Sequence, residues 1–209
     1  MVLIGGPGGA IQAIAEAARR EGAHVACGCL ELAPSHEAPR DHALVDQGFS
    51  ALLPRVDEPS IEAFVSAAIE RLGGLDVLVT AFSSGAAEAD ATPFSETTLA
   101  AWNARLEGAL RLPFLATRRA LEELLAGGAG GRIVIVHDRS LGDVGGLAAT
   151  TALSSLVRSL AREYGRRAIT CNAVVAGPAA ADGAARATLF FVSEDAAFVN
   201  GEMVVVDPS

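Results

Sequence analysis

Lysine is absent from this chain of 209 residues, and all 16 of its basic residues are arginines. Tyrosine occurs once, as Tyr164. Any chemistry that needs a lysine ammonium group, or a tyrosine elsewhere in the chain, is therefore excluded before motifs are considered. The formal net charge is −9, and no basic run is long enough to follow a phosphate backbone. These features argue against nucleic-acid binding and against anionic membrane surfaces.

Cysteine and long apolar runs are also scarce. The chain has three cysteines, and Cys27 and Cys29 lie two apart on a predicted strand, so no disulfide framework is implied. The cysteines lack the further ligands that a metal site would need, and the histidines are too scattered to supply them, so no metal is expected. No apolar run approaches the ~18 residues of a membrane span, and the first residues lack the charged region of a signal peptide. We therefore expect a cytoplasmic protein.

What the chain does contain is an alternation of short β-branched runs with alanine-rich helical stretches. This pattern is typical of βαβ units in a parallel sheet that is covered on both faces. The predicted strands cover 2–4, 24–29, 76–81, 132–136, 168–174 and 203–206. Helices are predicted at 10–21, 60–72, 95–125 with a break near Pro113, 146–164, and from Ala187, while 31–50 reads as a loop with at most a short helix. The length fits a single domain over residues 1–209, at roughly 100–200 residues per domain.

The first strand leads directly into the glycine-rich turn 5–9 and then into a helix. Glycine lets backbone N–H groups approach a pyrophosphate at a helix N-terminus, so this arrangement is typical of nucleotide-binding sites. Such turns also occur for packing alone, and both interpretations stay open at this point.

Several phrases along the whole chain resemble the short-chain dehydrogenase/reductase family. They are EGAHV at 21–25, LGGLDVLV at 72–79, GRIV at 131–134, ALSSLVRSLAREYG at 152–165, CNAV at 171–174, FFVSED at 190–195 and VNGE at 199–202. The resemblance implies a Rossmann-type, doubly wound α/β fold with three αβα layers and a parallel sheet of about seven strands. It also implies that NAD(P) lies across the carboxyl ends of the strands.

The family's chemistry is hydride transfer assisted by a tyrosine, a lysine four residues later, a serine and an asparagine. When the matching phrases are aligned, Gly146 falls on the tyrosine position and Thr150 on the lysine position. Asp138 falls on the serine position and Ala109 on the asparagine position. Glycine has no titratable group and threonine has no cation to favour a tyrosinate, so we predict that no catalytic residue of the family remains.

The cofactor positions are altered as well. Gly5 and Gly9 match the first two glycines of the phosphate turn, but the third falls on Ile11, and Pro7 removes a backbone donor. Cys29 stands where an acidic residue usually binds the ribose hydroxyls, and Glu31 is the nearest carboxylate that could replace it. Pro54 replaces the aspartate at adenine, and Thr80 to Ser83 replaces the Asn-Asn-Ala-Gly turn. We predict at most a degenerate nucleotide site at Gly5, Gly9 and Glu31, with NAD(P) bound instead by a partner subunit.

The substrate lid of the family is also predicted to be shortened, to about residues 178–187. His137 and Asp138 lie at the end of a central strand, and one interpretation is that they form an acid–base pair for altered chemistry. Consecutive strand residues, however, point to opposite faces, so we favour a simpler role for them at the loop.

The leading hypothesis is a non-catalytic subunit that pairs with an intact family member. The long helices 95–125 and 146–164 and the segment 187–206 correspond to the two dimer axes of family tetramers, so a heterotetramer is expected. One known pair of this kind resembles a 3-hydroxyacyl-CoA-type dehydrogenase for an aromatic succinyl-CoA. The alternatives are an enzyme of altered chemistry that uses Asp138 or His137, and a regulatory protein that binds a nucleotide or another ligand.

Overall fold

The computed structural model describes residues 1–6, 9–30, 50–53, 55–82, 93–138 and 144–207. In this part of the chain, seven parallel strands form one sheet in the order β3-β2-β1-β4-β5-β6-β7. The strands are β1 (Val2–Gly5), β2 (Ala26–Leu30), β3 (Ser50–Leu53), β4 (Val77–Phe82), β5 (Gly131–Asp138), β6 (Ile169–Ala176) and β7 (Met203–Val206). The order reverses between β1 and β4, and the carboxyl ends at such a switch point are where doubly wound sheets bind ligands.

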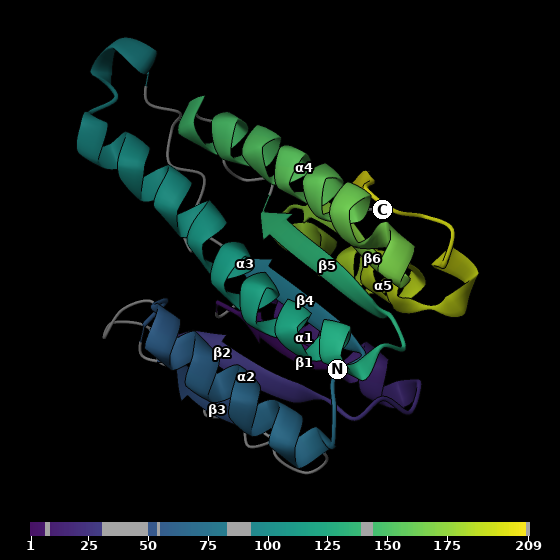
Figure 1. Cartoon of the computed structure of the whole chain (residues 1–209). Coiled ribbons are helices and arrows are strands. Elements are labelled where there is room, and N and C mark those ends of the chain that lie inside the picture. Colours follow the sequence, from purple (N-terminus) through teal and green to yellow (C-terminus); the bar gives the residue numbers. More distant parts are fainter. Residues whose placement is uncertain (7–8, 31–49, 54, 83–92, 139–143, 208–209) are drawn as a thin grey trace.

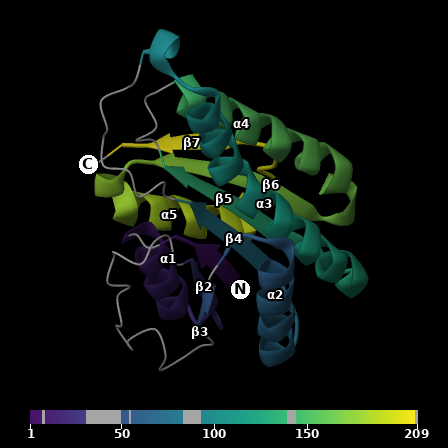
Figure 2. The ribbon, with the colours of Figure 1, turned by 90° about the vertical axis from the view of Figure 1, so that its left-hand side faces the viewer.

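Helices cover both faces of this sheet. One face carries α1 (Gly9–Arg20) and α5 (Ala181–Val192), and the other carries α2 (Glu58–Leu72), α3 (Leu99–Gly127) and α4 (Val144–Tyr164), as Figures 1 and 2 show. Short 3-10 turns lie at Phe94–Glu96, Gly165–Arg167, Pro178–Ala180 and Glu194–Ala196. The predicted three-layer Rossmann-type fold is confirmed.

The strands are apolar on both faces because each face contributes to a separate core. On β5, Ile133 and Ile135 point into the core beneath α2, α3 and α4. Val134 and Val136, which alternate with them, point into the core beneath α1 and α5. This period of two is the pleat of a strand buried on both sides.

Helix α3 differs from its prediction because Pro113 does not break it. The helix runs without interruption through Pro113, which is buried. Proline lacks the N–H that would bond to the Ala109 carbonyl, a defect of about 3 kcal/mol in an isolated helix. Packing on both sides of Pro113 keeps the helix continuous, since Ala109, Leu112, Ala116 and Ala120 are all buried.

Two further boundaries differ from the predictions. Strand β3 was not predicted: it begins at Ser50, the last residue of the segment 31–50 predicted as a loop, and it pairs with β2. The last helix begins at Ala181 rather than Ala187, so most of the segment predicted as a shortened lid is the first half of α5. Alanine has the highest helix propensity, and this half of α5 buries Ala184 and Ala185.

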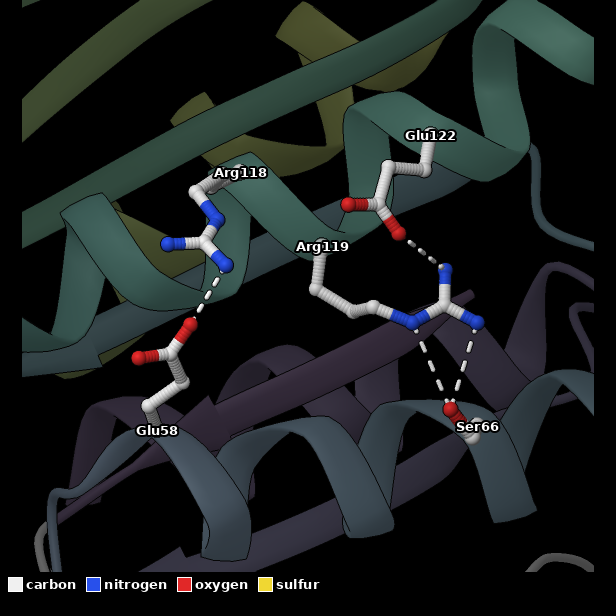
Figure 3. Close-up of polar contacts among 5 residues, drawn as sticks. All are labelled: Glu58, Ser66, Arg118, Arg119 and Glu122. Carbon is white, nitrogen blue, oxygen red and sulfur yellow. Dashed lines mark hydrogen bonds and ion pairs between the residues drawn. The ribbon is translucent and has the colours of Figure 1, made fainter.

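Polar contacts join α2 to α3 on the outside of their layer (Figure 3). Arg119 on α3 donates from Nε and Nη2 to Ser66 Oγ on α2, at 3.3 and 3.2 Å, and its Nη1 lies 3.6 Å from a Glu122 oxygen. Arg118 pairs with Glu58 at the start of α2. The two helices are therefore fixed to each other by side chains as well as by the core.

Candidate functional site

The turn after β1 brings the backbone of Gly5 and Gly6 against the end of β4. The Gly6 N–H donates to the Ala81 carbonyl oxygen at 3.1 Å. A side chain on Gly5 would collide with that same carbonyl group. Glycine is thus required here by the close approach of two strands, whether or not a nucleotide binds.

Ile11 and Ala181 occupy the space next to this turn. Ile11 is buried, and its Cδ1 lies 3.0 Å from where a Cβ on Gly5 would be. At the start of α1, a Cβ on Gly9 would lie 3.5 Å from the Cβ of Ala181, the first residue of α5. The amino end of α1 therefore packs against the amino end of α5. Glu31, the predicted ribose contact, lies outside the described residues.

His137 is buried on the side of β5 that faces α3 and α4. Only 1% of its surface is exposed, and its position continues the alternation of Ile133 and Ile135. An imidazole in this environment does not reach a substrate in an open cleft. The side chain of Asp138 lies outside the described part of the structure, so the alternative in which the two residues form an acid–base pair stays untested.

Helix α4 has small residues at its start. Gly145 and Gly146 are buried at its start. Thr150 donates its hydroxyl to the Gly146 carbonyl at 3.0 Å, and Thr151 does the same to Leu147 at 2.9 Å. The hydroxyl of Thr150 is thus bonded within its own helix. Ala109 on α3 is fully buried and contributes only a methyl group.

Tyr164 and two buried cysteines have raised pKa values, the opposite of the shift that activates such groups. Hydrogen bonding to Glu163, together with burial, raises the pKa of Tyr164, at the far end of α4. Burial raises the pKa of Cys27 to about 11, although Arg19 Nη2 lies 3.8 Å from its sulfur and opposes the shift. Burial also raises the pKa of Cys171, to about 12. Among the described residues, no three His, Cys, Asp or Glu side chains are arranged to hold a metal ion.

Residues 9–185 match the family model described as enoyl-(acyl carrier protein) reductase. The chain belongs to the short-chain dehydrogenase/reductase family. It is 37% identical over 145 residues to cis-4-hydroxycyclohexanecarboxylate dehydrogenase of Sinomonas cyclohexanicum, covering 65% of this chain and 56% of that enzyme. It is 28% identical over 199 residues to 2-(R)-hydroxypropyl-CoM dehydrogenase of Xanthobacter autotrophicus, covering 79% of both chains.

The solved structures agree with this assignment. A short-chain dehydrogenase/reductase from Burkholderia xenovorans superposes with a TM-score of 0.82 at 26% identity, covering 99% of this chain and 94% of that one. The match to the Sinomonas enzyme spans just over half of its length. Members of this family are oxidoreductases that typically bind NAD(P), and the carboxyl ends of β1, β4 and β5 are the place in this fold where the family's site lies.

The sequence identified the residues at this end of the sheet but not the contact that packs against them. Ile11, Gly146 and Thr150 follow from the alignment of short phrases. The contact between Gly9 and Ala181 joins positions far apart in the chain, and only the earlier start of α5 produces it. The alanine-rich run at 179–187 was the available signal.

Proposed function

We propose that this chain is a non-catalytic member of the short-chain dehydrogenase/reductase family that acts by pairing with a catalytically intact member. The proposal rests on the residues that α4 has at the family's catalytic positions. The family's tyrosine and lysine positions hold Gly146 and Thr150 here, and the Thr150 hydroxyl is turned back onto its own helix. The chain has no lysine to replace the missing cation.

Tyr164 does not rescue the mechanism. It lies about 27 Å along the helix axis from Gly146, at a rise of ~1.5 Å per residue. The shift of its pKa is also in the wrong direction, because a tyrosine acting as acid and base near neutral pH needs a lowered pKa. The burial of His137 argues equally against the alternative in which this residue acts on a substrate.

The residues at the β1–α1 turn fit NAD(P) poorly. Gly5 keeps the close approach of the backbone, but Ile11 fills the space beside it and Ala181 packs on Gly9. A pyrophosphate at the amino end of α1 would compete with both side chains. We therefore assign the NAD(P) of the assembly to the partner subunit.

Two apolar surfaces support the pairing. The first is an open groove of about 520 Å³ between α3 and α4, lined by Leu106, Leu110, Phe114, Ala152 and Leu156 among others. By length and composition alone, helix α4 could cross a membrane. Only 28% of its most apolar stretch is buried within this fold. In this fold it packs on β6 and α3, so its uncovered apolar side is available to another protein.

The second surface lies at the β7 edge of the sheet. Phe198 is 85% exposed, and Val204 and Val205 on the edge strand β7 are also exposed. The loop before β7 is held in place by two asparagines. Asn200 Oδ1 accepts from Cys171 N at 2.8 Å, and Asn172 Nδ2 donates to the Val199 carbonyl at 3.0 Å. Two such surfaces suit a heterotetramer in the cytoplasm, with a 3-hydroxyacyl-CoA-type dehydrogenase as one candidate for its activity.

Co-expression with an intact family member tests the pairing. We expect the two chains to co-purify, and we expect Phe114→Glu in this chain to abolish the complex. Ala63→Glu on the exposed side of α2, outside the segments assigned to the pairing, is the control and should leave the complex intact. Purified alone, the chain should give no NAD(P)-dependent turnover and no binding of NAD or NADP in calorimetry. Turnover by the isolated chain, or micromolar binding of either nucleotide, would contradict the proposal.

A further inference from the structure

Helix α5 begins very close to the end of the strand that precedes it. Strand β6 ends at Ala176, and α5 starts at Ala181, after the short turn at Pro178–Ala180. The Ala180 N–H donates to the Gly177 carbonyl at 2.9 Å and tightens this connection. Because β6 and β1 run parallel in one sheet, the amino ends of α5 and α1 both lie at its carboxyl edge. Doubly wound sheets bind their ligands at this edge.

Small residues let the amino end of α5 approach both α1 and the sheet. Helices α1 and α5 lie side by side on one face of the sheet (Figure 2). A Cβ on Gly9 would be in ordinary van der Waals contact with the Cβ of Ala181, at 3.5 Å. A Cβ on Gly183 would lie only 2.5 Å from Val206 Cγ1, so the first turn of α5 packs directly on β7. The first turn of α5 is therefore held between α1 and the sheet.

Ile11 closes the space from the side of α1. Only 4% of this residue is exposed, and it belongs to the same apolar core as Ala176 at the end of β6 and Ala180 in the connection. The end of β6, the turn after it and the first turn of α1 thus share one apolar cluster. A pyrophosphate is charged and needs hydrogen-bond donors, so it cannot enter this cluster without displacing part of it.

The charges of the two helix ends are also balanced within the chain. Each amino end carries partial positive charge from N–H groups that have no partner in their own helix. The first turn of α1 contains no acidic residue, whereas the first turn of α5 contains Asp182. Asp182 therefore supplies a carboxylate close to the place where a bound phosphate supplies negative charge in a nucleotide site.

We infer that the amino end of α5 is a fixed plug of the family's cofactor site, formed by Ala180 and Ala181 against Ile11. The chain fails to bind NAD(P) because of this packing, while the glycine turn beside the plug is retained. The short turn after β6 and the contact of Gly183 with β7 leave α5 no length to swing away as a lid does. The inference goes beyond the proposed pairing and does not depend on it, since it assigns the loss of cofactor binding to one contact.

Opening the contact from both sides tests the plug. The double variant Ile11→Ala with Ala181→Gly removes side-chain atoms from α1 and from α5. In titration calorimetry, ADP-ribose, which contains the pyrophosphate, should bind this variant at least about tenfold more tightly than the wild type. Adenosine, which lacks the pyrophosphate, should gain no affinity, and salt should weaken the binding of ADP-ribose. A folded double variant that gains no affinity for ADP-ribose, or gains as much for adenosine, would overturn the inference.

Matched variants locate the effect. Ile14→Ala removes the same atoms from the buried face of α1, about one turn beyond the plug, and should gain no affinity for ADP-ribose. An equal gain for Ile14→Ala would show general loosening of the fold and overturn the assignment. If the double variant does not fold, Ala181→Gly alone should still gain about threefold, and no gain there would overturn the inference.

The result is separable from the test of the pairing. Micromolar binding of NAD or NADP by the wild type would contradict both the pairing and the plug. A folded opened variant that stays unable to bind ADP-ribose would contradict the plug alone, because co-purification with an intact family member is measured on the wild type.

Discussion

Gly5 shows that the same glycine can be required for the packing of two strands and for the binding of a cofactor. Its missing side chain allows β1 and β4 to approach at the Ala81 carbonyl, where Gly6 donates a hydrogen bond. A glycine-rich turn can therefore persist after the nucleotide site beside it has changed. This is why the motif alone favoured nucleotide binding only weakly.

Substitution of Gly5 tests this structural role. Gly5→Ala should lower the free energy of unfolding by about 3 kcal/mol, because the new methyl group meets backbone that cannot move aside. Gly127→Ala at the exposed end of α3, where no atom lies within 4 Å of the added methyl group, is the control. It should change stability by less than about 1 kcal/mol, toward stabilisation. Urea unfolding of both variants measures the difference, and equal effects would contradict the role given to Gly5.

The buried thiol of Cys27 should make the fold less stable at alkaline pH. Burial raises its pKa to about 11 from an ordinary value of 9.0, so the unfolded chain loses this proton first as the pH rises. The contribution of this thiol to the free energy of unfolding is fully present below pH 9 and is lost between pH 9 and 11. It amounts to roughly 1.4 kcal/mol for each unit by which the folded and unfolded pKa values differ. Unfolding free energies measured from pH 8 to 11 should fall more steeply for the wild type than for Cys27→Ala. Parallel curves would show that the thiol does not titrate in this way.

At the scale of elements, packing overrode local sequence signals in two places. Pro113 predicts a break, but the residues on both sides of it bury one continuous face on the sheet. The strand β3 is short and follows a segment rich in proline and charge, so its pattern is weak, and pairing with β2 defines it. By contrast, the ends of α2 follow local chemistry. Asp57 accepts from Ser60 N at 2.9 Å at the start, and Gly73 ends the helix with a positive φ of 76°.

The contact between α2 and α3 offers a paired test of exposed and partly buried arginines. Arg119 has 20% of its side chain exposed and donates twice to Ser66, whereas Arg118 is 55% exposed in its pair with Glu58. Arg119→Ala should therefore cost about 1 kcal/mol of stability, and Arg118→Ala less than about 0.5 kcal/mol, because water and salt screen the exposed pair. Chemical denaturation distinguishes the two. A larger loss for Arg118→Ala would reverse this ranking.

At the scale of the whole molecule, the distribution of apolar surface points to association. The first half of α3 extends past the sheet (Figure 1), and Leu99, Phe114 and Leu147 are each more than half exposed on α3 and α4. Burial of such side chains against a partner is favourable by roughly 25 cal/mol per Å² removed from water. The net acidic charge keeps the remaining surface polar.

Without its partner, the chain should associate with itself through this surface. We expect sedimentation velocity at several concentrations to show dimers or larger species for the wild type. Phe114→Ser should shift the distribution toward monomer, and Ala63→Ser on the exposed side of α2 should not. A wild-type chain that stays monomeric at every concentration would count against both the surface and the proposed pairing.

The sequence by itself determined the fold class, the positions of most strands in a parallel sheet, and the residue types at the family's catalytic positions. These follow from the local periodicity of apolar residues, from short phrases shared with the family, and from a composition with no lysine and one tyrosine. Only the tertiary structure decided that α3 is continuous, that α5 begins at Ala181, and that its first residue packs on Gly9. It also decided the burial of His137. Each of these depends on segments distant in the chain meeting in space, which no local pattern encodes.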